Sequence, residues 1–152
     1  MAKMVEAYYK GLFIALNSTH ISEVSNAVEH VVIDGMRQSL LLPYSLDEVS
    51  ATLFQMHPSK SLGPDGMSPY FFQKLWHILG PDITSVVISI LHLGRYLHKM
   101  NYTHIVLLLN LKNMKHITEY RPISLGNVIF QLVLKVLANR VKTILPNVIF
   151  DS

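Results

Sequence analysis

The strongest constraint on this chain is the spacing of its apolar side chains, which repeats with the period of amphipathic helices between proline and glycine breaks. In residues 5–16 the apolar side chains fall at positions i, i+3, i+4 and i+7. The same spacing predicts helices over residues 22–33, 46–57, 69–79, 82–100 and 127–145. Gly35 and Pro58 should end the second and third helices, and Gly80-Pro81 should separate the fourth from the fifth.

Two segments are predicted to be extended rather than helical. Residues 103–111 are short, apolar and β-branched at their start, and Arg121 precedes a proline, which disfavours the helical backbone region. The two segments can pair antiparallel across a polar turn at residues 112–118. The predicted fold class is therefore α+β and predominantly helical, with several amphipathic helices and one short antiparallel β-ribbon at about 103–111 and 120–125. Gly63-Pro64-Asp65-Gly66 favours a tight turn.

The composition excludes several classes of protein and site. Half of the 152 residues are hydrophobic and only 15% are charged, which argues against intrinsic disorder. Because the chain has no cysteine, disulfides, thiolate metal sites and thiol catalysis are excluded. No run of about 18 consecutive apolar residues predicts a membrane span, and no targeting signal is recognised. We expect an intracellular protein of the nucleus or cytoplasm with no membrane partner.

The spacing of polar residues predicts no catalytic site and no metal site. The histidines are spread singly, no glycine-rich phosphate loop is present, and no two aspartates are placed to hold two metal ions. Charge is more informative, because residues 95–152 carry 8 basic and 2 acidic side chains, whereas residues 1–94 carry 5 and 8. A basic C-terminal third favours phosphate-bearing partners, and its alternative interpretation is a solvated helix face and loop.

Two stretches, residues 54–76 and 103–149, say more about function, because their motifs resemble those of a known family. The first contains Lys60, the Gly-Pro-Asp-Gly turn, Phe71-Phe72-Gln73-Lys74 and Trp76. The second contains residues 120–125 (YRPISL), 127–128 (NV) and 135–140 (KVLANR). Their order and separation resemble the N-terminal, fingers-side part of the reverse transcriptase of LINE-type (non-LTR) retrotransposons, in the form common in flowering plants. Residues 8–13 resemble the linker that precedes this polymerase.

The resemblance implies a domain organisation and a nucleotide contact. Residues 1–42 would be a helical linker region preceding the polymerase, and residues 43–152 a fingers-like part of the reverse transcriptase domain. Arg121 would contact the phosphates of the nucleotide, because a guanidinium stays charged and offers a planar fork of donors. The alternative for Arg121 is a surface ion pair with Glu119.

The resemblance also implies contacts with an RNA template or primer-template. Lys112 and Lys115 would approach the template backbone, or form a solvated hairpin tip. Lys60 would touch nucleic acid, or only support the turn beside it. The remaining candidates, whose alternative is favourable charge near a helix C-terminus, are Lys135, Arg140 and Lys142. Phe71, Phe72 and Trp76 are expected in the core more than in base stacking.

Departures from the family pattern limit what this chain is expected to do. Leu108-Leu109-Asn110 stands where the family has Ile-Pro-Lys, Gly126 where a cysteine is usual, and Phe130-Gln131 where Tyr-Lys is usual. The family's metal-binding palm aspartates would follow Ser152, and its endonuclease would precede residue 1. We therefore expect no catalytic or metal-binding residue here, with Mg²⁺ needed only in the complete polymerase and the missing palm domain as a partner. A non-catalytic RNA-binding module and a decayed product without function are the alternatives.

Overall fold

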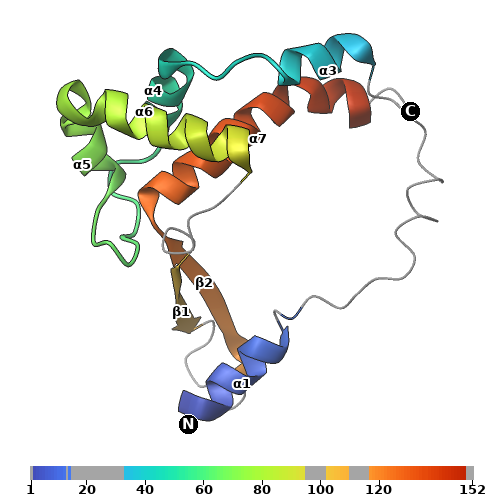
Figure 1. The fold of residues 1–152 in the computed structure, drawn as a ribbon. Helices are drawn as coiled ribbons and strands as arrows, with labels where there is room; N and C mark the ends of the chain where they lie inside the picture. The colour runs from blue at the N-terminus through green and yellow to red at the C-terminus, as the bar shows by residue number, and fades with distance from the viewer. Residues whose placement is uncertain (1, 13, 15–32, 95–101, 110–116, 150–152) are drawn as a thin grey trace.

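The computed structural model describes residues 2–12, 14, 33–94, 102–109 and 117–149, and it shows a helical body from which a two-stranded ribbon projects (Figure 1). The body contains α3 (Asp34–Leu40), α4 (Leu46–Phe54), α5 (Pro69–Lys74), α6 (Trp76–Leu93) and α7 (Val128–Ile149). The ribbon contains β1 (Thr103–Leu109) and β2 (Tyr120–Gly126), with a 3-10 turn at Ile117–Glu119 and with α1 (Ala2–Leu12) beside it. The predicted α+β, predominantly helical class is confirmed.

One hydrophobic core holds α4, α5, α6 and α7 together. Burying apolar side chains away from water is the main force that stabilises such a core. Its most buried side chains have no exposed surface and come from three helices: Val49 and Leu53 of α4, Val87 of α6, and Leu132, Val133 and Val136 of α7. Phe72 of α5 is 6% exposed and belongs to the same core, and Trp76 packs against it, as predicted for both. Phe71 is 38% exposed.

The buried stripe of α7 differs from the prediction. The apolar spacing of residues 127–145 predicts that Leu134, Val141 and Leu145 face inward, but all three are exposed, and Val133 is buried instead. Burial is concentrated in the first turns of α7, where α4 and α6 pack. Farther along, α7 contacts α3, a helix of seven residues with none buried, which offers little surface to cover apolar side chains. The apolar spacing of residues 46–57 also predicts that Leu46 and Phe54 of α4 face inward, but both are exposed.

The helix boundary predicted at Gly80-Pro81 is wrong, because the break lies at Leu75 and both residues are inside α6. The Trp76 indole lies directly over Gly80, where an added Cβ would come within 2.9 Å of the ring atom Cε2. Pro81 lies in the second turn of α6, so it removes only one early backbone hydrogen bond. The helix ends earlier than predicted, at Gly94, whose left-handed backbone (φ 59°) is a common helix terminator.

Other helix boundaries also differ from those predicted. The first helix covers Ala2–Leu12 rather than residues 5–16, and Gly35 lies inside α3 instead of ending a helix. The last helix continues to Ile149 through Pro146. The predicted helix at residues 22–33 lies almost wholly outside the described residues, as do residues 95–100 of the predicted fifth helix and residues 110–111 of the first predicted strand.

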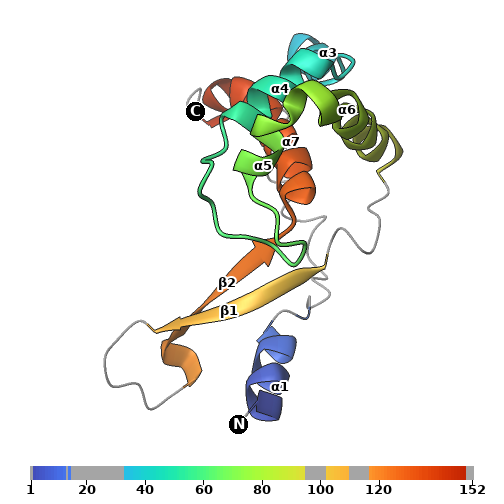
Figure 2. The same ribbon diagram turned by 90° about the vertical axis from the view of Figure 1, so that its left-hand side faces the viewer.

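The predicted ribbon is confirmed as an antiparallel pair, with Thr103 opposite Gly126 and Leu109 opposite Tyr120. It extends away from the helices, so much of its surface faces solvent (Figure 2). Tyr9 of α1 is 6% exposed, and its hydroxyl donates a 3.5 Å hydrogen bond to the carbonyl oxygen of Tyr120. Helix α1 therefore packs against the end of the ribbon that lies farthest from the body.

Helix α6 is long and apolar enough to cross a membrane, with 18 residues and a mean hydropathy of 1.3. In the fold it supplies Ile83, Val87 and Ile90 to the core. A core helix of this kind passes the same test of length and composition, so the helix carries no argument for a membrane.

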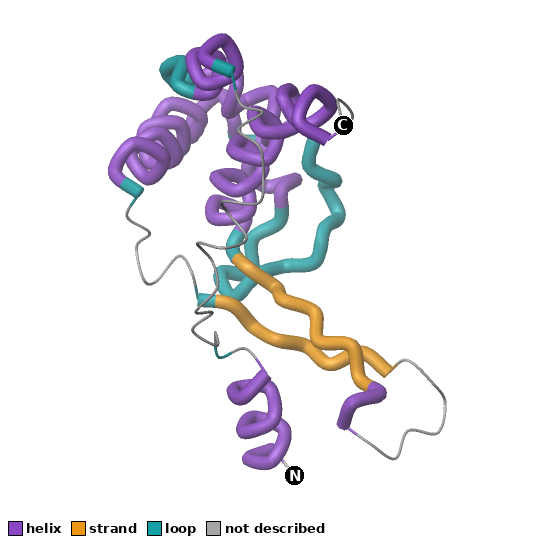
Figure 3. The backbone as a smooth tube through the Cα atoms, turned by 90° about the vertical axis from the view of Figure 1, so that its right-hand side faces the viewer, coloured by secondary structure: helices purple, strands orange, loops and turns teal. Residues whose placement is uncertain are grey.

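The turn at residues 63–66 joins the body to the ribbon. The Gly66 N–H donates to the Gly63 carbonyl at 3.0 Å, and Gly66 has a φ of 68°, as the predicted tight turn requires. Gly63 lies against the junction of β2 and α7, where an added Cβ would come within 2.5 Å of the Gly126 carbonyl oxygen. The Asp65 N–H also donates to Oδ1 of Asn127 at 3.3 Å. The loop thus reaches down from the helices to the base of the ribbon (Figure 3).

We expect Gly63→Ala to lower the free energy of unfolding by about 1–3 kcal/mol, because the new methyl group would overlap rigid backbone atoms. Urea denaturation followed by circular dichroism measures this change. Gly35→Ala is the matched control, since no atom lies within 4 Å of its added Cβ and alanine favours the helix. Equal stability of Gly63→Ala and wild type would contradict the contact.

Candidate nucleic-acid interface

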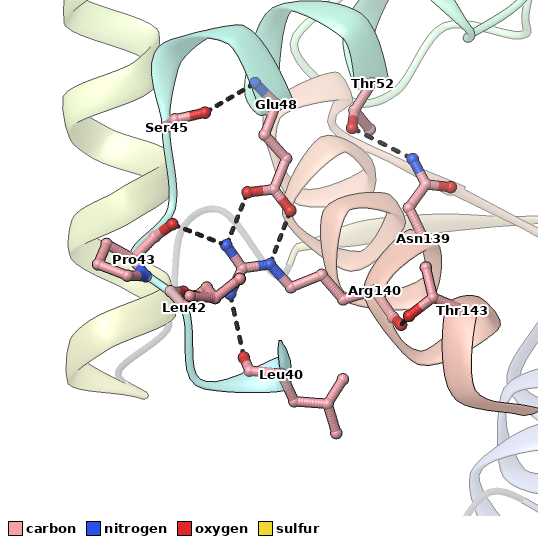
Figure 4. Close-up of polar contacts among 9 residues, drawn as sticks. All are labelled: Leu40, Leu42, Pro43, Ser45, Glu48, Thr52, Asn139, Arg140 and Thr143. Atoms are coloured by element: carbon pink, nitrogen blue, oxygen red, sulfur yellow. Dashed lines mark hydrogen bonds and ion pairs between the residues drawn. The ribbon is translucent and has the colours of Figure 1, made fainter. Parts of the chain in front are cut away.

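Arg140 lies at the centre of the polar contacts between α4 and α7 (Figure 4). Its Nε and Nη2 donate to Oε1 and Oε2 of Glu48, both at 2.7 Å, which is a bidentate ion pair. The Arg140 and Glu48 side chains are only 12% and 25% exposed. The hydrogen bond to Glu48 raises the pKa of Arg140, while burial opposes this shift. Ser45 fixes the first turn of α4, because its hydroxyl oxygen accepts from the Glu48 N–H at 3.1 Å.

The same guanidinium also binds the segment between α3 and α4. Nη1 donates to the carbonyl oxygens of Leu40 (3.0 Å) and Leu42, and Nη2 donates to that of Pro43 at 3.0 Å. Cζ of Arg140 lies 3.6 Å from the centroid of the Tyr44 ring, a cation–π contact. In place of the predicted nucleic-acid contact, the structure commits this side chain to a network inside the protein. We assign Arg140 a structural role and leave it out of the interface.

Two other motif residues also hold the fold together. Nδ2 of Asn139 donates to Oγ1 of Thr52 at 3.2 Å and to Oε1 of Gln55 at 3.1 Å, which links α7 to α4. Nε2 of Gln73 donates to the carbonyl oxygens of Leu53 (3.0 Å) and Met56 (2.9 Å). These carbonyls lie at the C-terminal end of α4, so Gln73 caps that helix from α5.

Lys60 and Lys135 come together at one groove, although they belong to separate motifs. The groove has a volume of about 460 Å³ and lies between the loop after α4 and the middle of α7. Lys60 is exposed and Lys135 is half-buried. The other lining residues are Gln55, Met56, His57, Ser59 and Ser61, with no carboxylate among them. Two cations and four side chains with hydrogen-bonding groups thus share a hollow that suits an anion.

The remaining predicted cations lie elsewhere. Arg121 is exposed on β2 opposite Leu108, and its guanidinium makes no hydrogen bond or ion pair with any residue that the structure describes. Lys142 is exposed on α7 beyond the groove. Lys112 and Lys115 lie outside the described residues. The structure therefore brings together Lys60 and Lys135 and leaves Arg121 on the projecting ribbon.

Sequence reasoning missed two residues beside Lys60. His57 lines the lysine groove, and Tyr70, 52% exposed, lines a neighbouring hollow that Lys60 also borders. The proximity of Tyr70 to Lys60 depends on the path of the intervening loop, which no local pattern reveals. Within the described ranges, no group of three or more histidine, aspartate or glutamate side chains is placed to hold a metal ion.

Comparison with known proteins connects the chain to mobile genetic elements. No protein-family model matches it. It is 33% identical, over 119 residues that make up 78% of the chain, to the Transposon TX1 uncharacterized 149 kDa protein of Xenopus laevis. The chain spans about 9% of the length of that relative. This similarity relates the chain to a transposon protein.

Replacing Arg140 by leucine should lower the free energy of unfolding by about 3 kcal/mol, because it leaves the Glu48 carboxylate and several carbonyls without their donor. Arg140→Lys should restore only part of the loss, since an ammonium lacks the planar fork. Chemical denaturation of both variants measures the effect. Lys142→Ala, which removes an exposed cation from the same helix, should change stability by less than about 0.5 kcal/mol. A stability loss in Lys142→Ala as large as in Arg140→Leu would argue against the network.

Proposed function

We propose that this chain is a fingers-side piece of a non-LTR retrotransposon reverse transcriptase, of the form common in flowering plants, and that it holds an RNA template or primer-template. Three lines support the proposal: the resemblance of its motifs, the similarity to a transposon protein, and the exposed cations of the two motif stretches. Residues 43–152 would form the fingers-like part and residues 1–42 the linker that precedes it.

The contact between Gly63 and the Gly126–Asn127 junction is the observation that carries the proposal. Residues 54–76 and 103–149 were identified by resemblance as separate stretches, and the fold joins them through direct backbone contact. The contact places the two stretches in one structural unit and leaves Lys60, Lys135 and Arg121 exposed or half-buried at its surface. A unit with such cations suits a phosphodiester backbone.

We propose that the chain does not polymerise by itself. Transfer of a nucleotide commonly needs carboxylates that hold two metal ions, and the described residues offer no such cluster. In the complete polymerase, Mg²⁺ and its aspartates would belong to a palm domain that acts as partner to this piece. Apolar side chains exposed on the ribbon, among them Ile105 and Leu108, are candidates for covering by that partner.

A non-catalytic RNA-binding module is the second candidate function, and the lysine groove favours it. Such a module needs a cationic surface and no palm domain. The two candidates differ in whether a palm domain joined to this chain restores polymerisation. A product without function would instead show neither RNA binding nor cooperative unfolding.

The purified chain should bind single-stranded RNA with an affinity that falls as salt rises, because bound cations release counterions from the phosphates. Fluorescence anisotropy over a series of salt concentrations measures the affinity. Arg121→Ala should weaken binding to all RNA sequences alike, and the slope of log K against log salt should fall by about 0.7. Lys10→Ala, an exposed cation on α1, is the charge-matched control. Absence of binding even at low ionic strength would refute the proposal.

A primer-extension assay tests the proposal that the chain does not polymerise by itself. With a primed RNA template, deoxynucleotides and Mg²⁺, the purified chain should give no extended product, because the residues that the structure describes hold no carboxylate cluster for two metal ions. A complete reverse transcriptase serves as the positive control. Extension that depends on both Mg²⁺ and this chain would overturn the proposed inactivity.

A further inference from the structure

We propose that the loop of residues 57–62 is a binding site for a single nucleic-acid strand, with backbone phosphates in the lysine groove and one base against Tyr70. The site rests on the proposed function and makes it specific, because it assigns a position and a strand type to the contact. Arg121, on the ribbon, is not part of it.

The phosphate side of the site is the lysine groove. Lys60 and Lys135 supply two positive charges, and Ser59 and Ser61 supply hydroxyl groups. Nδ1 of His57 accepts a 3.2 Å hydrogen bond from the Ser59 N–H, so Nε2 is the ring nitrogen that can donate to a ligand. That nitrogen remains a donor. The groove therefore offers ammonium, hydroxyl and imidazole donors without a competing carboxylate in its lining, which matches a phosphodiester rather than a cation or an apolar ligand.

The base side is a second hollow that the same loop lines. It has a volume of about 540 Å³, and its lining comprises Pro58, Ser59, Lys60, Ser61, Leu62, Ser68 and Tyr70. Tyr70 is 52% exposed, and Nζ of Lys74 lies 5.4 Å from the centroid of its ring. An exposed aromatic ring between cations is a typical platform for an unpaired base.

The two hollows share the wall formed by residues 59–61. A strand that crosses this wall can place its phosphates on one side and a base on the other. In a duplex the bases already stack on one another inside the helix, so Tyr70 would have no free base face to meet. The arrangement therefore favours a single strand over a duplex.

The test measures the affinity of the full 152-residue chain for a fluorescent oligouridylate and for an RNA duplex of equal length. Lys60→Ala and Lys135→Met each remove one charge, and the methionine keeps most of the lysine stem. Each should reduce the salt slope by about 0.7 for the single strand. Tyr70→Leu should weaken binding of the single strand by about fivefold or more, whereas Tyr70→Phe should leave it unchanged. Lys10→Ala is the charge-matched control, and thermal unfolding verifies that each variant is folded.

The outcomes separate this inference from the proposed function. If wild type binds RNA and the Lys60→Ala, Lys135→Met and Tyr70→Leu variants bind it as tightly as wild type does, the loop site is wrong and the proposed function stands. If wild type binds no RNA, both are wrong. Tighter binding of the duplex, or competition by polyglutamate as effective as by RNA, would also overturn the site, because the latter would indicate an acidic peptide as ligand.

Discussion

The close approach of Gly63 to the Gly126–Asn127 junction determines how the two parts of this molecule are arranged. The ribbon is continuous with α7 through Asn127, and the turn at residues 63–66 packs against that connection. Gln131 adds a further restraint, because its Nε2 donates to the Gly126 carbonyl oxygen at 2.6 Å. The base of the ribbon and the loop with Lys60 therefore meet at the same junction. The proposed nucleotide contact at Arg121 and the proposed strand contact at Lys60 are thus held in a fixed arrangement.

Many residues that carry the family resemblance serve the fold rather than a ligand. Gln73 caps α4, Asn139 links α7 to α4, and Arg140 holds Glu48 and the segment before α4. These roles require hydrogen-bond donors of defined shape at defined positions, which is a demand as strict as ligand binding. Within the described residues, the cations left for nucleic acid are therefore fewer than the basic composition of the C-terminal third suggests.

Local chemistry was enough to predict the ribbon, the tight turn and the core positions of Phe72 and Trp76, because proline, glycine and apolar spacing act over a few residues. It failed at Gly80-Pro81, where the Trp76 indole needs a residue without a side chain and the helix continues. It also failed for the buried stripe of α7, and it gave no sign of the ion pair between Arg140 and Glu48. Both depend on which neighbour covers each helix, as does the meeting of Lys60 with Lys135 at one groove. That information lies in tertiary packing.

The base of the ribbon meets the turn at residues 63–66 through main-chain atoms of Gly126 and through the side chain of Asn127, and this arrangement decides which substitutions the ribbon tolerates. Substitutions along the exposed strand positions alter the chemistry of the ribbon without moving it, since Gly63 meets main-chain atoms of Gly126 and Asn127. The departure at Leu108 from the family pattern falls in that tolerant region, with the pairing of the two strands intact. A chain with this fold can therefore change the exposed side chains of its ribbon while the ribbon keeps its position and its strand pairing.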